Sequence, residues 1–354
     1  MSRGKLTRRQ FGVASAGAVA GVAMARGMSV RAQDATPEAS PAWVPPTGVS
    51  VYADGLYNPR YISFDENDAL FISEAGDAGP DAHTAVAGEG TPESTEVLSN
   101  SGLTGQVTKI AADGTRNVLT AGLPSYSFGS EVVGPAGISY RDGKLVLAVG
   151  GPGAASFAFE TLPMTNVVLS IDPASGEVTQ LADILSFKRD NNPDPNSLDS
   201  NLYGNAIGSD GTVYQADAGG NTVYKIDATS GELSVLAVLP GVPMPGFANP
   251  ARGGNEEIDP VPTGVVAASD GNVWIAELTG GPFPPMAASI YAADAMGTLT
   301  QAATGLTMIG GIAEGPDGMI YAAQISDNLL GQTPPAPGSI VKVDDILRAL
   351  QRLD

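Results

Sequence analysis

Polar residues recur at one position of a repeating pattern in this chain. Seven residues after the first residue of each of five turns, an otherwise apolar run reaches Glu74, Val149, Asp217, Glu277 and Gln324. Carboxylates that meet in space repel one another, so they need a cation, a proton or hydrogen-bond donors. Oxygen ligands of this kind suit Ca²⁺. The pattern predicts a calcium site with ligands from Glu74, Asn201, Glu277 and Asn58.

Asp217 and Asn221 allow two interpretations. A short Asp or Asn side chain caps the backbone N–H groups of a turn, so both residues can be structural. The same groups can also contact a ligand. We therefore take Asp217 and Asn221, together with Arg60 and Thr263, as candidate ligand-binding residues.

The other chemical motifs are incomplete. The run Asp190–Asp194 has the acidic spacing of a calcium loop, but Pro195 stands where an EF-hand needs Gly. Two interpretations of this run remain, an irregular ion-binding loop and an Asx-rich turn. The single histidine, His83, would have to serve any Ser-His-Asp triad, and no Gly-x-Ser-x-Gly turn accompanies it. We therefore predict no catalytic residue.

Composition excludes several functions. The chain of 354 residues has no Cys and a net charge of −20. Without cysteine there is no disulfide, zinc–thiolate site or iron–sulfur cluster. A surface this acidic repels nucleic acid and anionic lipid, so we expect no nucleic-acid partner.

The N-terminus has the features of an export signal. Residues 1–32 carry six basic residues and no acidic one, with Arg8-Arg9 ahead of a short run of small and apolar residues. This arrangement is typical of a twin-arginine signal peptide, which we expect to be cleaved after Ala32. The mature protein would then be extracellular or in the cell envelope, with no transmembrane anchor. Residues 33–47, rich in Pro, Ala and Thr, predict a flexible linker.

These candidate residues are positioned by a repeated unit of four strands. Asp-Gly turns between β-patterned runs recur at Asp142, Asp210, Asp270 and Asp317, and a related turn lies at Asn67-Asp68. Such turns indicate hairpins, and a second hairpin follows each one. Repeated four-stranded units predict an all-β fold, a β-propeller over residues 48–344 with five repeats. We expect Val49–Ala53 to pair with Ser339–Asp344 and close the ring, and residues 345–354 to form a short helix.

Several motifs, taken together, resemble a known family. They are the NHL-type stretch Asn221–Asp227, the run Gly55–Arg60, the Asn-rich segment that contains Asn201, and Glu277–Pro284. In combination they are similar to the ScyD/ScyE family of secreted bacterial propellers. This resemblance implies a six-bladed ring of the NHL and gluconolactonase-like group, with no established activity. It also implies that Asp217 and Asn221 brace the loop between two hairpins.

Two functions follow as expectations. Long insertions at corresponding places suggest an elaborated binding face. The first expectation is therefore a non-catalytic module that binds a small molecule or a protein on its loop-rich face. The alternative is a calcium-dependent hydrolase of the lactonase or phosphotriesterase type. The resemblance implies this alternative, because the related lactonase-type propellers bind one divalent ion.

Overall fold

The computed structural model describes residues 47–86, 96–128, 131–152, 161–197, 199–249, 252–327 and 337–343. The predicted signal peptide, nearly all of the predicted linker and the predicted C-terminal helix lie outside these residues. Among the described residues, no helix is long and apolar enough to cross a membrane.

The described strands form six antiparallel sheets, and we call the five larger ones, in chain order, blades 1 to 5. Blade 1 contains β1 (Pro59–Phe64), β2 (Leu70–Glu74), β4 (Glu96–Ile110) and β5 (Arg116–Phe128), with β3 (Asp81–Val86) and β6 (Glu131–Val133) at its margin. Blade 2 contains β7 (Pro135–Arg141), β8 (Lys144–Val149), β9 (Val167–Ile171) and β10 (Val178–Asp183).

The later blades repeat this plan. Blade 3 contains β11 (Leu202–Ile207), β12 (Thr212–Asp217), β13 (Thr222–Asp227) and β14 (Leu233–Val238). Blade 4 contains β17 (Pro262–Ala267), β18 (Val273–Glu277), β19 (Ala288–Ala293) and β20 (Leu299–Leu306). Blade 5 contains β21 (Ile309–Glu314), β22 (Ile320–Gln324) and β23 (Ser339–Lys342). A small pair, β15 (Val242–Pro243) and β16 (Glu257–Ile258), lies between blades 3 and 4, and α1 (Ile184–Asn191) follows blade 2.

The hairpin turns form for the reason predicted. At Asp210-Gly211 the glycine has φ of +86°, which a residue with a side chain rarely adopts. The Asp210 carboxylate accepts the Thr212 N–H at 2.9 Å and closes the turn. The strands on either side, β11 and β12, then pair in antiparallel register.

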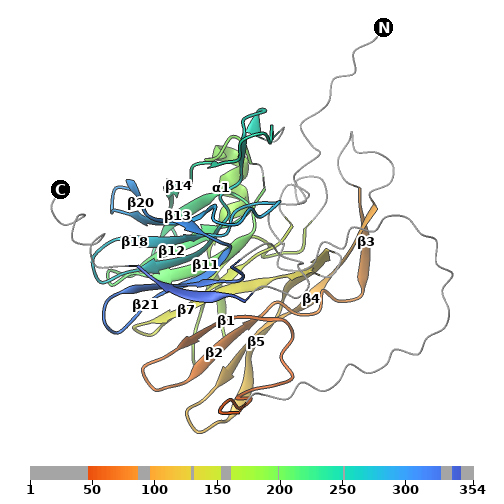
Figure 1. Ribbon diagram of the computed structural model, residues 1–354. Coiled ribbons are helices and arrows are strands. Elements are labelled where there is room, and N and C mark those ends of the chain that lie inside the picture. Colours follow the sequence, from red (N-terminus) through yellow and green to blue (C-terminus); the bar gives the residue numbers. More distant parts are fainter. Residues whose placement is uncertain are drawn as a thin grey trace.

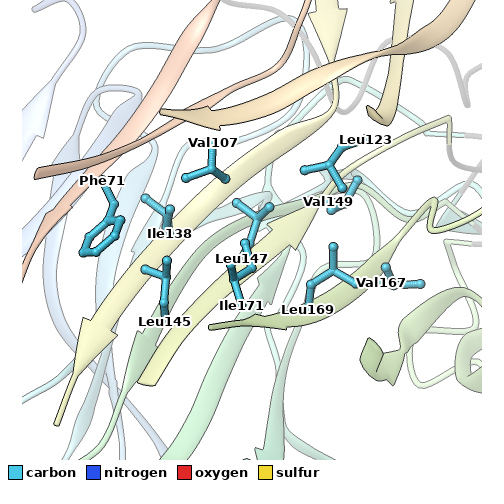
Figure 2. Packing of buried hydrophobic residues seen from close by; sticks show 10 residues of the cluster. All are labelled: Phe71, Val107, Leu123, Ile138, Leu145, Leu147, Val149, Val167, Leu169 and Ile171. Atoms are coloured by element: carbon cyan, nitrogen blue, oxygen red, sulfur yellow. The ribbon is translucent and has the colours of Figure 1, made fainter. Parts of the chain in front are cut away.

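Consecutive blades pack face to face through apolar clusters. Between blades 1 and 2, the buried residues Phe71, Val107 and Leu123 meet Ile138, Leu147 and Leu169 (Figure 2). Equivalent clusters join blades 2 and 3, 3 and 4, and 4 and 5. Successive four-stranded meanders packed in this way are the β-propeller architecture that the repeats predict (Figure 1).

The predicted closure between the two ends of the domain is wrong. Residues 49–53 form no strand, and β23 pairs only with β22 among the described strands. The N-terminal segment is held on blade 1 instead. Ala53 and Leu56 pack against Leu70, Ile72 and Ile110. The Arg116 guanidinium also donates to the carbonyl oxygens of Asp54 and Gly55.

Candidate functional site

The long connections all lie at one end of the blades. Because the strands of each blade alternate in direction, the tight hairpin turns fall at one end and the other connections at the opposite end. We call this opposite end the loop end. The first strand of every blade begins there and the second strand finishes there, so the residues predicted from the repeats reach it.

Glu74, the last residue of β2, is buried and fully paired. Its Oε2 accepts the backbone N–H of Tyr57 at 2.6 Å. Its Oε1 accepts from the side chains of Gln106, at 2.9 Å, and Thr108, at 2.5 Å. These donors satisfy both carboxyl oxygens and tie the entry to β1 to the blade.

Glu277 occupies the same place in blade 4, yet neither carboxyl oxygen has a hydrogen-bond partner among the described residues. Register accounts for one of the missing donors. Glu74 lies opposite Pro59, and Glu277 lies opposite Pro262, so the counterpart of Tyr57 is Pro260. Proline has no N–H to donate. Burial raises the pKa of Glu277 to about 8. The hydroxyl and backbone N–H of Ser289, which face the carboxyl without meeting hydrogen-bond geometry, lower this pKa by less, so the carboxyl is largely protonated at neutral pH.

The same contact recurs in blade 5, which shows that it belongs to the repeat. Gln324 lies opposite Ile309, and its Oε1 accepts the N–H of Thr307, two residues earlier, at 2.6 Å. Blades 1, 4 and 5 place a Glu or Gln at this position, and of these three only blade 4 has proline in place of the donor. Beside Glu277, the buried Thr279 hydroxyl is also unpartnered among the described residues.

Asp217 braces its loop. Its Oδ1 accepts the N–H groups of Asn201, at 2.8 Å, and Gly220, at 2.9 Å. Burial raises the pKa of the Asp217 carboxyl, although the positive charge of Lys188 opposes this. Lys188 comes from α1, which begins after the N-cap Asp183, and its side chain is buried. A Cβ on Gly220 would lie 2.2 Å from Asp217 Oδ2 and 2.7 Å from Lys188 Nζ, so a larger residue would displace these two side chains.

Asn221 joins a buried ionic network between blades 3 and 4. Its Nδ2 donates to Asp194 Oδ2 at 2.9 Å and to Asp259 Oδ1 at 2.8 Å. Arg252 lies 2.8 Å from Asp259, 3.5 Å from Asp194 and 3.5 Å from Glu257. Three carboxylates surround one guanidinium, so the network carries an excess of negative charge.

The remaining predicted residues lie around the start of the first strands. Asn58 donates to the carbonyl oxygen of Gly76 at 2.7 Å. Arg60 donates to the carbonyl oxygen of Val132. It also faces Glu131, whose pKa burial raises to about 7 while Arg60 lowers it. Thr263 donates to Ile309 O at 2.7 Å and accepts at its own carbonyl from the Tyr61 hydroxyl at 2.8 Å, so Tyr61 links blade 1 to blade 4.

The hydrogen bonds of Glu74 compete with the predicted calcium site. Both oxygens of Glu74 already accept hydrogen bonds, and no hydrogen bond or ion pair between described residues joins Glu74 to Glu277. In the same part of the chain, no group of three or more His, Cys, Asp or Glu side chains could hold a metal ion. The calcium site stays a prediction.

An apolar floor lies beside these polar groups. Ala218, Val261, Leu278 and Met308 are buried together at the loop end. Tyr203, Phe283 and Ile325 pack on them and are only partly buried. We call these seven residues the floor. The Tyr203 ring also meets Tyr61 edge to face, with centroids 5.6 Å apart. An apolar floor bordered by a few polar groups is a common form of small-molecule site.

The sequence pattern identified some of these residues and missed others. It identified Glu74, Asp217, Asn221 and Glu277 from their place in the repeat. It missed Lys188, Arg252 and Asp259, because they lie in irregular connections whose pairing is set by the fold, and it named Asp194 only as part of an incomplete calcium loop. One available signal was Pro260, which removes a donor at a position where other blades have one. The predicted candidate His83 lies in β3, paired with Ser99.

No protein-family model and no curated protein matches this sequence. Solved structures do match. A streptogramin B lyase is 18% identical, with a TM-score of 0.42 over 75% of this chain and 61% of that chain. A gluconolactonase from Xanthomonas campestris is 12% identical, with a TM-score of 0.45 over 77% and 70%. A virginiamycin B lyase from Staphylococcus aureus is 15% identical, with a TM-score of 0.43 over 80% and 69%. The chain thus spans less than two thirds of the streptogramin B lyase, and these likenesses assign it no activity.

Proposed function

We propose that this protein is an exported propeller of the ScyD/ScyE type that binds a small molecule at the loop end of blades 3 to 5 without transforming it. Export is supported by the Arg8-Arg9 pair and the cleavable pattern of residues 1–32. The family assignment is supported by the combined motifs, including Glu277–Pro284.

The floor is the observation that carries the binding proposal. Phe283 and Tyr203 present rings at partly exposed positions above a buried apolar layer. Rings of this kind bind flat apolar surfaces. The ionic network beside the floor holds Asp194, Glu257 and Asp259 against one Arg252. This excess negative charge favours a neutral or cationic ligand with an apolar body over an anionic one.

The carboxyl groups support binding over hydrolysis. Glu74 is committed to three donors of its own chain. Glu277 holds a proton at neutral pH, but its side chain is buried. A general acid must reach the leaving group of its substrate within hydrogen-bond distance. The enclosed Glu277 does not offer that contact.

Binding of a neutral aromatic dye tests the proposal. We expect Nile red fluorescence to rise on titration with the protein, and Phe283→Ala to weaken binding about tenfold, since losing one ring contact costs on the order of 1 kcal/mol or more. The matched control is Met296→Ala, because Met296 is an exposed apolar residue in the β19–β20 turn at the opposite end. If both variants lost affinity for Nile red equally, or if Phe283→Ala lost none, binding at the floor would be refuted.

Melting in the presence of calcium tests the alternative hydrolase and its predicted ion site. An ion that binds only the folded protein raises the melting temperature as its concentration rises. The contacts around Glu74 lead us to expect no shift between millimolar Ca²⁺ and excess chelator. A shift that disappears in Glu277→Gln would instead restore the calcium site. A lactone and ester panel would then be the next assay.

A further inference from the structure

The first strands of the blades carry glycine at one position, except in blade 1. The third residue is glycine in β7, β11, β17 and β21, and it is Tyr61 in β1. Two of these glycines lie against the backbone of the next first strand. A Cβ on Gly137 would lie 2.3 Å from Tyr203 O. A Cβ on Gly204 would lie 2.7 Å from Thr263 O. Of the five blades, only blade 1 places a large side chain at this position.

The side chain of Tyr61 reaches from blade 1 to blades 3 and 4. Its hydroxyl donates to Thr263 O in β17 at 2.8 Å. The same oxygen lies 3.1 Å from the place that a Cβ on Gly204 of β11 would take. β1 lies beside β7, β7 beside β11, and β11 beside β17, and these strands gather near the middle of the molecule (Figure 1). Tyr61 therefore spans the centre around which the first strands lie.

Tyr61 lies farther from the loop end than the floor does. Val261 and Met308 of the floor immediately precede β17 and β21, whereas Tyr61 is the third residue of β1. Tyr203, the second residue of β11, lies between these levels, and its ring contacts Tyr61 edge to face. Tyr61 is only partly buried. Because its hydroxyl hydrogen is bonded to Thr263 O, Tyr61 presents an apolar ring below the floor.

We propose that Tyr61 is a specificity-determining residue, which closes the centre of the propeller below the floor and sets the length of ligand that the site accepts. This inference rests on the binding function proposed above. A flat neutral ligand stacks on Phe283 and Tyr203, and an apolar tail that extends inward from there meets the Tyr61 ring. Tail atoms beyond that contact stay in water and add no affinity. The site therefore selects compact ligands with a flat apolar body and a short tail.

A series of 4-alkylphenols from methyl to octyl tests the limit in the parent protein. The series keeps one flat neutral ring and changes only the length of the tail, and calorimetry gives each dissociation constant. We expect the affinity to rise about fourfold for each added CH₂ group that becomes buried, and then to level off where the tail meets Tyr61. A steady rise from methyl to octyl in the parent would overturn the proposal. This measurement needs no substitution, so it holds even where a variant fails to fold.

Three variants locate the limit at the Tyr61 ring. Tyr61→Ala removes the ring, so its affinity should keep rising beyond the parent's limit and reach at least a tenfold gain over the parent for octylphenol. Tyr61→Phe keeps the ring and should level off where the parent does. Tyr140→Ala is the matched control, because it removes a tyrosine from a first strand, β7, near the hairpin turn. It should leave the limit unchanged.

The outcomes separate this inference from the function on which it rests. A role of Tyr61 in stability alone would lower the melting temperature of Tyr61→Ala without moving the tail length at which affinity levels off. That result would overturn the inference, and the proposed function would stand as long as Phe283→Ala weakens every member of the series. If Phe283→Ala changed the affinity of no member, the proposed function would fail, and the role of Tyr61 with it.

Discussion

At the scale of single residues, two buried glutamates at one repeat position behave differently because of their donors. Glu74 accepts three hydrogen bonds, whereas Glu277 accepts none from the described residues. A buried charge is tolerated when it is hydrogen-bonded and is costly when it is not. The same position in the repeat therefore does not give the two glutamates the same hydrogen bonds, because the donors around each carboxyl group differ.

Glu277→Gln should change how stability depends on pH. The pKa of Glu277 is raised from about 4.5 in the unfolded chain to about 8 in the folded protein. The folded protein therefore holds a proton that the unfolded chain releases between these values. Stability falls as pH rises through this window, by up to about 1.4 kcal/mol per pH unit. The glutamine variant should lack this contribution and be more stable than the parent at pH 8, as measured by urea unfolding from pH 4 to 9.

Glu74→Gln is the matched control for that series. Replacing one acceptor oxygen by an NH₂ group sets donor against donor, because Tyr57, Gln106 and Thr108 already point at the carboxylate. We expect a loss of about 1–3 kcal/mol, the cost of leaving a buried polar group unpaired. Destabilisation of both variants to the same extent at pH 8 would contradict the assignment of Glu277.

At the scale of elements, the segment that enters each blade decides whether the polar residue of that blade is satisfied. In blades 1 and 5, the backbone N–H groups of Tyr57 and Thr307 donate to Glu74 and Gln324. Each donor lies two residues before the residue that pairs with its acceptor. In blade 4 this place is taken by Pro260, which has no N–H. Pro260 nevertheless accepts the Thr279 N–H at its carbonyl oxygen, at 3.0 Å, so its backbone follows the common path.

Pro260→Ala should therefore restore the missing donor. With an N–H aimed at Glu277, the pKa of its carboxyl should fall toward the ordinary value, because a hydrogen bond to the carboxylate favours the charged form. The dependence of unfolding free energy on pH between 5 and 8 should become shallower. Pro262→Ala, two residues further along, lies outside this contact and serves as the control. An unchanged dependence in Pro260→Ala would show that the missing N–H is not the cause.

The repeats allowed most of the blades to be predicted, because turns such as Asp210-Gly211 are local features with one favoured geometry. The ionic network could not be predicted in the same way. Arg252 meets Asp194 across 58 positions of the sequence, through connections without periodicity. The wrong closure has a similar origin. Val49–Ala53 alternates like a strand, but the contacts of Ala53 and Leu56 with blade 1 hold the segment elsewhere.

At the scale of the whole molecule, apolar side chains reach solvent in more than one place. The loop end carries the floor and its acidic border. Exposed apolar side chains also lie on β1, at Ile62 and Phe64, and on β23, at Ile340. All of these places are apolar, so binding of a dye by itself does not say which one is used. The account requires that ligand binding belongs to the loop end.

Hydrogen–deuterium exchange with and without bound Nile red tests this claim most directly. The account predicts slower exchange of backbone amides around 278–283 and 306–309, where the floor lies, and unchanged exchange in the turn at 294–298. Protection confined to β1 and β23, or spread evenly over both ends of the blades, would contradict a binding site at the loop end.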